Sequence, residues 1–255
     1  MFYQKIAPCE PLKELVSHYW AASWDSRLSH RKSIYYTIAN TLTDITFAFN
    51  DSSSNSQLLF TAVQVHTERP NQIKVPGFNH LVGASLFSHA IPELLDRTPD
   101  GLKGEFIPLK DVLGADADRL AGQLEDAPNL SCQIQVLNNF FYQRLNPKKD
   151  LDGRMAYAIQ LIQSNQGQKR IPELASACSL SQKQFGRIFK AYTGFNPKLF
   201  SRIVRFEAVV KSGKTWSSQT EAAHELGYHD QAHFIREFKS FTGLIPKDFW
   251  KLSEA

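Results

Sequence analysis

The feature that most constrains this 255-residue chain is an internal repeat near its C-terminal end. Residues 185–200 align without gaps on residues 234–249, and nine positions carry the same residue in both copies. The shared residues are, in order, Phe, Arg, Phe, Lys, Thr, Gly, Pro, Lys and Phe. Repetition at a fixed offset indicates a duplicated structural unit. We therefore expect two similar motifs in this part of the chain.

The sequence of each copy predicts two short helices joined by a turn. In the first copy Ser181 is placed to cap a helix over residues 181–192. In the second copy Gly227 supplies the sharp turn, and Asp230 is placed to cap a helix over residues 230–241. The order helix, turn, helix is typical of proteins that place their second helix in the major groove of DNA.

In each second helix two phenylalanines fall four positions apart, so we expect them to pack inward. They are Phe185, Phe189, Phe234 and Phe238. The polar residues of the same helices are then left for contact with a partner, and Arg is the usual reader of guanine. We predict that the DNA-binding residues are Lys183, Gln184, Arg187, Lys190, Gln231, His233, Arg236 and Lys239. Gly186 offers no side chain to a base, which leaves Lys183 and Arg187 as the main contacts of the first copy.

A long helix over residues 197–211 is predicted between the two copies. Its fifteen residues, at 1.5 Å each, form a spacer of roughly 22 Å. With the bodies of the two motifs added, the contact helices are expected about 34 Å apart, which is one turn of duplex. One chain would then read two successive major grooves.

The charge is distributed unevenly along the chain. Residues 1–150 carry 14 Lys and Arg against 16 Asp and Glu, whereas residues 151–255 carry 15 against 9. By charge alone, this asymmetry suits either a polyanionic partner for the C-terminal part or a merely solvated basic face. No stretch approaches the roughly 18 consecutive apolar residues of a membrane span, and the N-terminus lacks the pattern of a secretory signal. We therefore expect a cytoplasmic protein that does not bind membranes.

The N-terminal part reads as β-rich. Runs of aromatic and β-branched residues alternate with turn-forming clusters, as in an antiparallel sheet or a small barrel. The predicted strands are residues 16–24, 34–39, 44–49, 58–65 and 81–87. Further on, apolar residues at steps of three and four predict a helix over residues 130–145. Its stripe suits either core packing or a dimer seam.

These patterns together predict the α+β class. Residues 1–146 are expected to form a β-rich domain with accessory helices. Residues 151–252 form an all-α domain of two helix-turn-helix motifs joined by a long helix.

The most specific residues of the C-terminal part are Leu174-Ala175, Ser181, Phe185, Arg187, Phe189-Lys190, Gly194, Pro197, Arg205, Ala208, Ala223, Gly227-Tyr228, Asp230, Phe234, Arg236, Phe238-Lys239, Gly243 and Pro246. At these positions residues 151–252 resemble the DNA-binding domain of the AraC/XylS family of bacterial transcription regulators. The resemblance implies two helix-turn-helix motifs that bind promoter DNA in a sequence-specific manner. Residues 1–146 more loosely resemble the β-rich regulatory domain of some members.

The partner that this resemblance implies is double-stranded promoter DNA. RNA polymerase, an unknown small-molecule effector and a second copy of the chain, bound through the N-terminal domain, are further candidates by analogy.

Other functions remain as alternatives. His66, His80 and His89 lie on or beside predicted strands. The main alternative is therefore a metal- or small-molecule-binding β-barrel, a sensor or an enzyme, whose basic helical domain is only an interaction module. RNA binding is disfavoured because no pattern of exposed aromatic residues accompanies the basic charge.

Motifs for catalysis are missing from the sequence. His224-Glu225 lacks the second histidine of a zinc protease motif, and there is neither a Gly-rich phosphate loop nor a nucleophile elbow. The three cysteines are far apart, so neither a disulfide framework nor a thiolate metal cluster is indicated. We therefore predict no enzymatic activity, no catalytic or metal-binding residues and no cofactor.

Overall fold

The computed structural model of the chain describes residues 2–25, 34–50, 57–65, 69–74, 78–99, 102, 106–145, 153–212 and 219–253. The chain divides into two compact units. Unit 1 comprises Met1–Tyr35, Leu42–His66 and Ile73–Lys149. Unit 2 comprises Tyr36–Thr41, Thr67–Gln72 and Asp150–Ala255.

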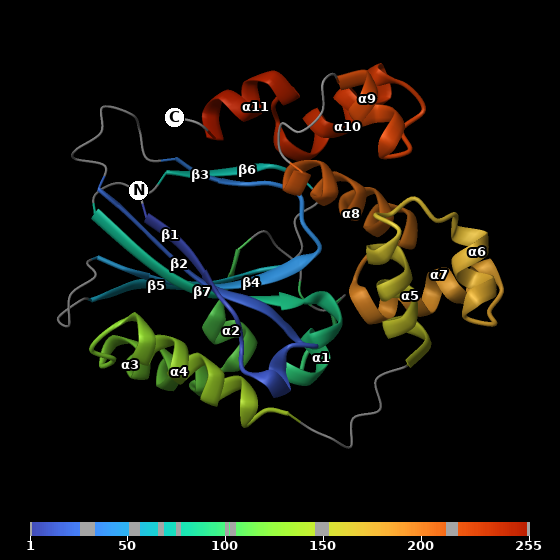
Figure 1. The fold of residues 1–255 in the computed structure, drawn as a ribbon. Coiled ribbons are helices and arrows are strands. Elements are labelled where there is room, and N and C mark those ends of the chain that lie inside the picture. Colours follow the sequence, from blue (N-terminus) through green and yellow to red (C-terminus); the bar gives the residue numbers. More distant parts are fainter. Residues whose placement is uncertain are drawn as a thin grey trace. The chain divides into compact units, whose positions relative to one another are not determined.

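A six-stranded antiparallel sheet forms the centre of unit 1, with the strand order β1-β2-β7-β4-β5-β8 (Figure 1). Its strands are β1 (Phe2–Ile6), β2 (Val16–Asp25), β4 (Leu42–Phe49), β5 (Leu58–Gln64), β7 (Phe78–Phe87) and β8 (Ile107–Pro108). A second, two-stranded sheet pairs β3 (Ile34–Thr37) with β6 (Asn71–Lys74). The five predicted strands are present, and the α+β class is confirmed. The sequence did not reveal β1, because four of its five residues are exposed and it shows no alternation.

Short helices and 3₁₀ turns complete unit 1. They are η1 (Glu10–Leu12), η2 (Ser88–Ala90), α1 (Ile91–Leu94), α2 (Leu109–Leu113), α3 (Ala115–Glu125) and α4 (Leu130–Tyr142). Helix α4 packs against the sheet: the rings of Tyr19 and Phe141 stack at 6.4 Å, and the Tyr19 hydroxyl donates to Asn138 Oδ1 at 3.1 Å. Because Ile134, Leu137 and Phe141 are buried, the apolar stripe of α4 serves core packing.

The opposite face of the sheet carries a row of polar side chains. Ser85 on β7 is paired with His18 on β2 and with Asp44 on β4, and Asp44 is paired with Gln64 on β5. Residues directly opposite each other on antiparallel strands share a face, so these four side chains form one row. Burial raises the pKa of Asp44 to about 6, although the hydrogen bond from the Ser85 hydroxyl and the charge of Lys5 oppose this shift.

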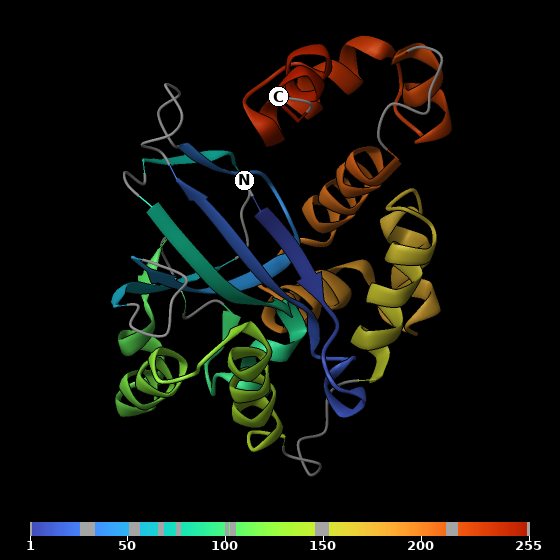
Figure 2. The same cartoon turned by 60° about the vertical axis from the view of Figure 1, so that its left-hand side comes forward.

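Unit 2 is mainly helical. Its helices are α5 (Gly153–Ser164), α6 (Ile171–Ala177), α7 (Gln182–Thr193), α8 (Pro197–Ser212), α9 (Gln219–Glu225), α10 (Gln231–Thr242) and α11 (Pro246–Ser253). Helix α8 runs between the two motifs (Figure 2). The ring of Phe200 packs edge-on against Phe189 with the ring centroids 5.3 Å apart. The ring of Phe206 packs against Phe238 with the centroids 5.4 Å apart. The two motifs therefore share one hydrophobic core.

A segment from the N-terminal half of the chain also belongs to unit 2. Ala39 is buried in the same core, and its N–H donates to the Phe241 carbonyl at 3.0 Å. Thr41 donates its N–H and its hydroxyl to Glu207 Oε1 on α8, at 2.9 and 3.1 Å. Since β4 begins at Leu42, this segment is joined directly to the sheet of unit 1.

In the parts of the chain that the structure describes, no helix combines the length and the apolar character that a membrane crossing requires.

Candidate nucleic-acid interface

The first motif consists of α6 and α7, and the start of α7 is fixed by a capping box. Ser181 Oγ accepts a hydrogen bond from the Gln184 N–H at 3.3 Å, and Gln184 Oε1 accepts one from the Ser181 N–H at 3.1 Å. The predicted cap is thus confirmed, and the side chain of Gln184 is engaged at the helix end. Lys183, Arg187 and Lys190 lie exposed on the outer face of α7.

The second motif consists of α9 and α10, and Asp230 is the N-cap of α10, as predicted. Its carboxylate accepts hydrogen bonds from the His233 N–H at 2.6 Å and from the His229 ring at 3.0 Å. These bonds lower the pKa of Asp230. Among the predicted contacts on α10, His233 is half-buried, and the exposed ones are Gln231, Arg236 and Lys239.

Part of the repeat has a structural explanation. The four phenylalanines of α7 and α10 are buried, as expected from their spacing. Thr193 and Thr242 each donate a hydroxyl to the carbonyl four residues earlier, at 2.8 and 2.9 Å, and accept the N–H two residues later, at 3.1 Å. Gly194 and Gly243 end the helices with φ angles of 81° and 76°. The repeated Phe, Thr and Gly residues therefore maintain the fold.

The repeated cations of α7 and α10 have no such explanation. Arg187, Lys190, Arg236 and Lys239 are exposed, and none of them forms an ion pair with a residue that the structure describes. They occupy equivalent positions on two helices of similar construction. This arrangement presents two matching cationic faces to solvent.

Arg205 on α8 links the α5–α6 loop to the second motif. Its guanidinium donates to the Gly167 carbonyl in the α5–α6 loop at 3.0 Å and to the Gly227 carbonyl in the second motif at 3.3 Å. The loop approaches α8 so closely that a Cβ atom at Gly167 would lie 2.0 Å from the Ser201 carbonyl oxygen. Gly167 also has a φ of +71°, so this contact depends on glycine.

A buried carboxylate joins α8 to α10. Glu237 Oε2 lies 2.6 Å from Arg202 Nε and 3.8 Å from His233 Nε2, and only 3% of the Glu237 side chain is exposed. The nearby Tyr228 is also buried, and this burial, together with the charge of Glu237, raises the pKa of its phenol. The position of α10 relative to α8 is thus set by an ion pair as well as by apolar packing.

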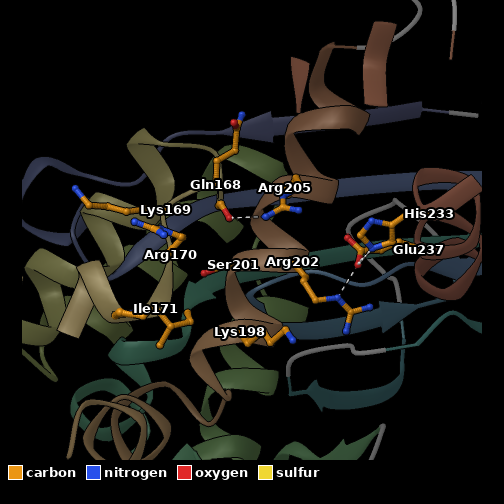
Figure 3. A pocket seen from close by; sticks show the side chains of 12 residues that line it. Gln168, Lys169, Arg170, Ile171, Lys198, Ser201, Arg202, Arg205, His233 and Glu237 are labelled. Carbon is orange, nitrogen blue, oxygen red and sulfur yellow. Dashed lines mark hydrogen bonds and ion pairs between the residues drawn. The ribbon is translucent and has the colours of Figure 1, made fainter. Parts of the chain in front are cut away.

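A pocket of about 680 Å³ opens at this junction and is called the basic pocket below (Figure 3). Its walls come from the α5–α6 loop, α8 and α10. Its acidic group is Glu237, and its basic residues are Lys169, Arg170, Lys198, Arg202, Arg205 and His233. In Figure 3 Lys169 and Arg170 lie on one side and His233 and Glu237 on the other, with α8 between them.

Most residues that line the basic pocket were not predicted from the sequence as contacts with DNA. Of the eight predicted contacts, only His233 lines it. Two cations immediately precede α6, at Lys169 and Arg170, and two lie one turn apart on α8, at Lys198 and Arg202. Cations at such positions beside a helix-turn-helix motif could have indicated a basic site from the sequence. That the four side chains line one pocket depends on tertiary structure.

The histidines considered as metal ligands do not come together where the structure describes them. Within the described ranges, no group of three or more His, Cys, Asp or Glu residues could hold a metal ion. The His80 ring packs against Phe49 at 6.2 Å, and His89 Nε2 lies 2.8 Å from the Glu14 carbonyl. Burial lowers the pKa of His89. His66 lies outside the described residues.

Comparison with known proteins gives two family matches. A family described as a helix-turn-helix domain matches residues 174–251, and a family described as a domain of unknown function (DUF6597) matches residues 4–108. An uncharacterized HTH-type transcriptional regulator from Haemophilus influenzae is 32% identical over 94 residues. The match covers 36% of this chain and 32% of that protein, so the chain spans about a third of its relative.

A solved structure resembles the chain over most of its length. The structure of ToxT from Vibrio cholerae aligns with a TM-score of 0.50, covering 92% of this chain and 98% of that chain. Its sequence identity is 10%, so the likeness concerns the fold. It covers both the β-rich part and the helical part.

Proposed function

We propose that this chain, whose C-terminal part is a helix-turn-helix domain of the AraC/XylS type, is a sequence-specific DNA-binding transcription regulator. It reads two successive major grooves of promoter DNA with α7 and α10. In this proposal residues 151–252 bind DNA, residues 1–146 regulate that binding, and the protein acts in the cytoplasm without catalytic activity or a cofactor.

One observation carries the proposal. Some of the nine shared residues build each motif, and others lie exposed. The exposed pairs Arg187/Arg236, Lys190/Lys239 and Lys198/Lys247 are all cationic. A bundle held only by its core has no need to repeat such residues at identical positions. Two matching cationic helices on one connected scaffold suit a double helix, because successive turns present equivalent grooves.

For unit 1 we propose a regulatory role through a small molecule. The row of His18, Ser85, Asp44 and Gln64 places several hydrogen-bonding groups on one face of the sheet. A carboxylate with a raised pKa in such a row is a recognisable feature of ligand sites. RNA polymerase and a second copy of the chain are further proposed partners, by analogy with the family.

The test is selection of duplex DNA from a random library by the full chain, at about 0.15 M salt, where loose charge attraction is already weakened. The full chain is preferred to a fragment beginning at residue 151, because unit 2 includes Ala39 and Thr41. We expect enrichment of two short motifs whose centres lie about ten base pairs apart.

Two controls separate specific from nonspecific binding. A variant that carries Arg187→Ala and Arg236→Ala should enrich neither motif while keeping its thermal unfolding profile. If the wild-type chain enriches no sequence and its binding disappears as salt rises, charge attraction alone accounts for the binding, and the proposed function is wrong.

A further inference from the structure

We propose that the basic pocket binds phosphate groups of the DNA strand that connects the two recognition sites. This inference rests on the proposed function and extends it to a site outside the two recognition helices. The first reason is position. The pocket is built from the α5–α6 loop, α8 and α10, so whatever fills it lies between the two motifs. In this proposal the strand that passes from one major groove to the next follows this route.

The second reason is the distribution of charge within the pocket. Arg170 is paired with Glu173 at 2.5 Å, and Arg202 is paired with Glu237 at 2.6 Å. Neither Lys169 nor Lys198 forms an ion pair with a residue that the structure describes, and Lys198 is exposed at the start of α8. The pocket therefore keeps uncompensated positive charge toward solvent, as a phosphate site requires.

The third reason is a buried hydroxyl that lines the pocket. Ser201 is 5% exposed, and its Oγ has no hydrogen-bond partner among the described residues. A buried hydroxyl without a partner is costly, and an anion oxygen is a suitable acceptor for it. Ser201 lies one turn from Lys198 on α8 and beside Arg202, so one bound phosphate can receive both a hydrogen bond and charge compensation.

A single experiment tests the site with its own control. The repeat provides a matched pair: Lys198 starts α8 in the pocket, and Lys247 occupies the equivalent position at the start of α11, outside the pocket. The full chain carrying Lys198→Gln, Ser201→Ala or Lys247→Gln is titrated with the duplex enriched by the wild-type chain. Affinities are measured from low to high salt.

We expect Lys198→Gln to reduce the slope of log K against log salt by about one unit and to weaken binding at every sequence to a similar extent. Ser201→Ala, which changes no charge, should weaken binding without changing the slope. The same titrations are repeated on a duplex whose linkages between the two motifs are neutral methylphosphonates. On this modified duplex Lys198→Gln should cause no further loss of DNA affinity, whereas any effect of Lys247→Gln on affinity should persist.

The results of these titrations distinguish failure of the phosphate contact from failure of the proposed regulator function. If the wild type selects its duplex, but Lys198→Gln weakens the methylphosphonate duplex as much as the natural one, the phosphate contact is refuted while the regulator function stands. If the wild type selects no duplex, both proposals fail.

A free anion is the competing occupant. Inorganic phosphate titrated into the full chain without DNA should bind weakly and should compete with the duplex. Saturable phosphate binding that Lys198→Gln abolishes, with DNA affinity unchanged, would assign the pocket to a small anion and overturn the DNA contact.

Discussion

The two helix-turn-helix motifs share nine residues of the repeat, but they differ in the contacts that stabilise them. Glu237 of the second motif is buried and paired with Arg202, whereas the equivalent residue of the first motif is Ile188. In the segment Tyr36–Thr41, Ala39 forms a hydrogen bond with the end of α10 and Thr41 forms two with α8. The repeat therefore preserves exposed cations and the Phe, Thr and Gly contacts of each motif, while other supporting contacts have diverged.

This difference has a consequence for regulation. Thr41 belongs to unit 2, and the next residue, Leu42, begins a central strand of unit 1. If unit 1 regulates DNA binding as proposed, a change in β4 has a covalent route of one peptide bond to the segment whose Ala39 bonds the end of α10. We expect the second motif to respond first to events in unit 1.

The largest expected effect tests what the motifs share. Phe189→Ala and Phe238→Ala each remove a fully buried ring from the common core. Each should lower the free energy of unfolding by about 3 to 5 kcal/mol. Amide hydrogen exchange in α7 and α10 should accelerate together in both variants. Exchange confined to the mutated motif would show two independent cores.

The ion pair of the second motif gives the next effect. Arg202→Met leaves the carboxylate of Glu237 buried without its partner, which should cost about 2 to 3 kcal/mol in urea unfolding. The double variant with Glu237→Ile installs the residue type of Ile188 and should recover most of the loss. A double variant less stable than the single one would contradict this account of the pair.

DNA contacts should distinguish the two recognition helices. Arg236→Ala is expected to cost about 1 to 3 kcal/mol of binding and to relax preference at one base pair of one site. Arg187→Ala should relax the preference at the other site. Lys239→Ala serves as the control, because loss of a phosphate contact weakens all sequences alike. If Arg236→Ala also weakened all sequences equally, its role in base reading would be refuted.

Local rules predicted much of this molecule. The caps at Ser181 and Asp230, the buried phenylalanines and helix α8 follow from capping chemistry and periodicity, which act over a few residues. The inclusion of Ala39 in the helical core and the contact of Gly167 with Ser201 join residues far apart in the chain. No local pattern encodes them, so the basic pocket emerged only from the fold.

The segment Tyr36–Thr41 can be tested through its acceptor on α8. Glu207→Ala removes the oxygen that accepts the N–H and the hydroxyl of buried Thr41, and should cost about 1 to 2 kcal/mol. Glu207→Gln retains an acceptor and should behave nearly as the wild type. Hydrogen exchange should rise in α8 and α10 while α6 and α7 stay protected. An equal rise of hydrogen exchange in α6, α7, α8 and α10 would contradict the idea that this segment supports the second motif in particular.

The smallest effect concerns Gly186, where the second motif has Ile235. No atom outside the local helix lies within 4 Å of a Cβ built at this position, so Gly186→Ala should fit without strain. It should stabilise the chain by about 0.5 to 1 kcal/mol, because alanine loses less backbone entropy in a helix. Gly194→Ala is the matched control and should destabilise, since the φ of 81° at that helix end disfavours any Cβ. If Gly186→Ala instead lowered DNA affinity without lowering stability, the glycine would be required for close approach to DNA. The first motif would then bind through its backbone at the position where the second presents a side chain.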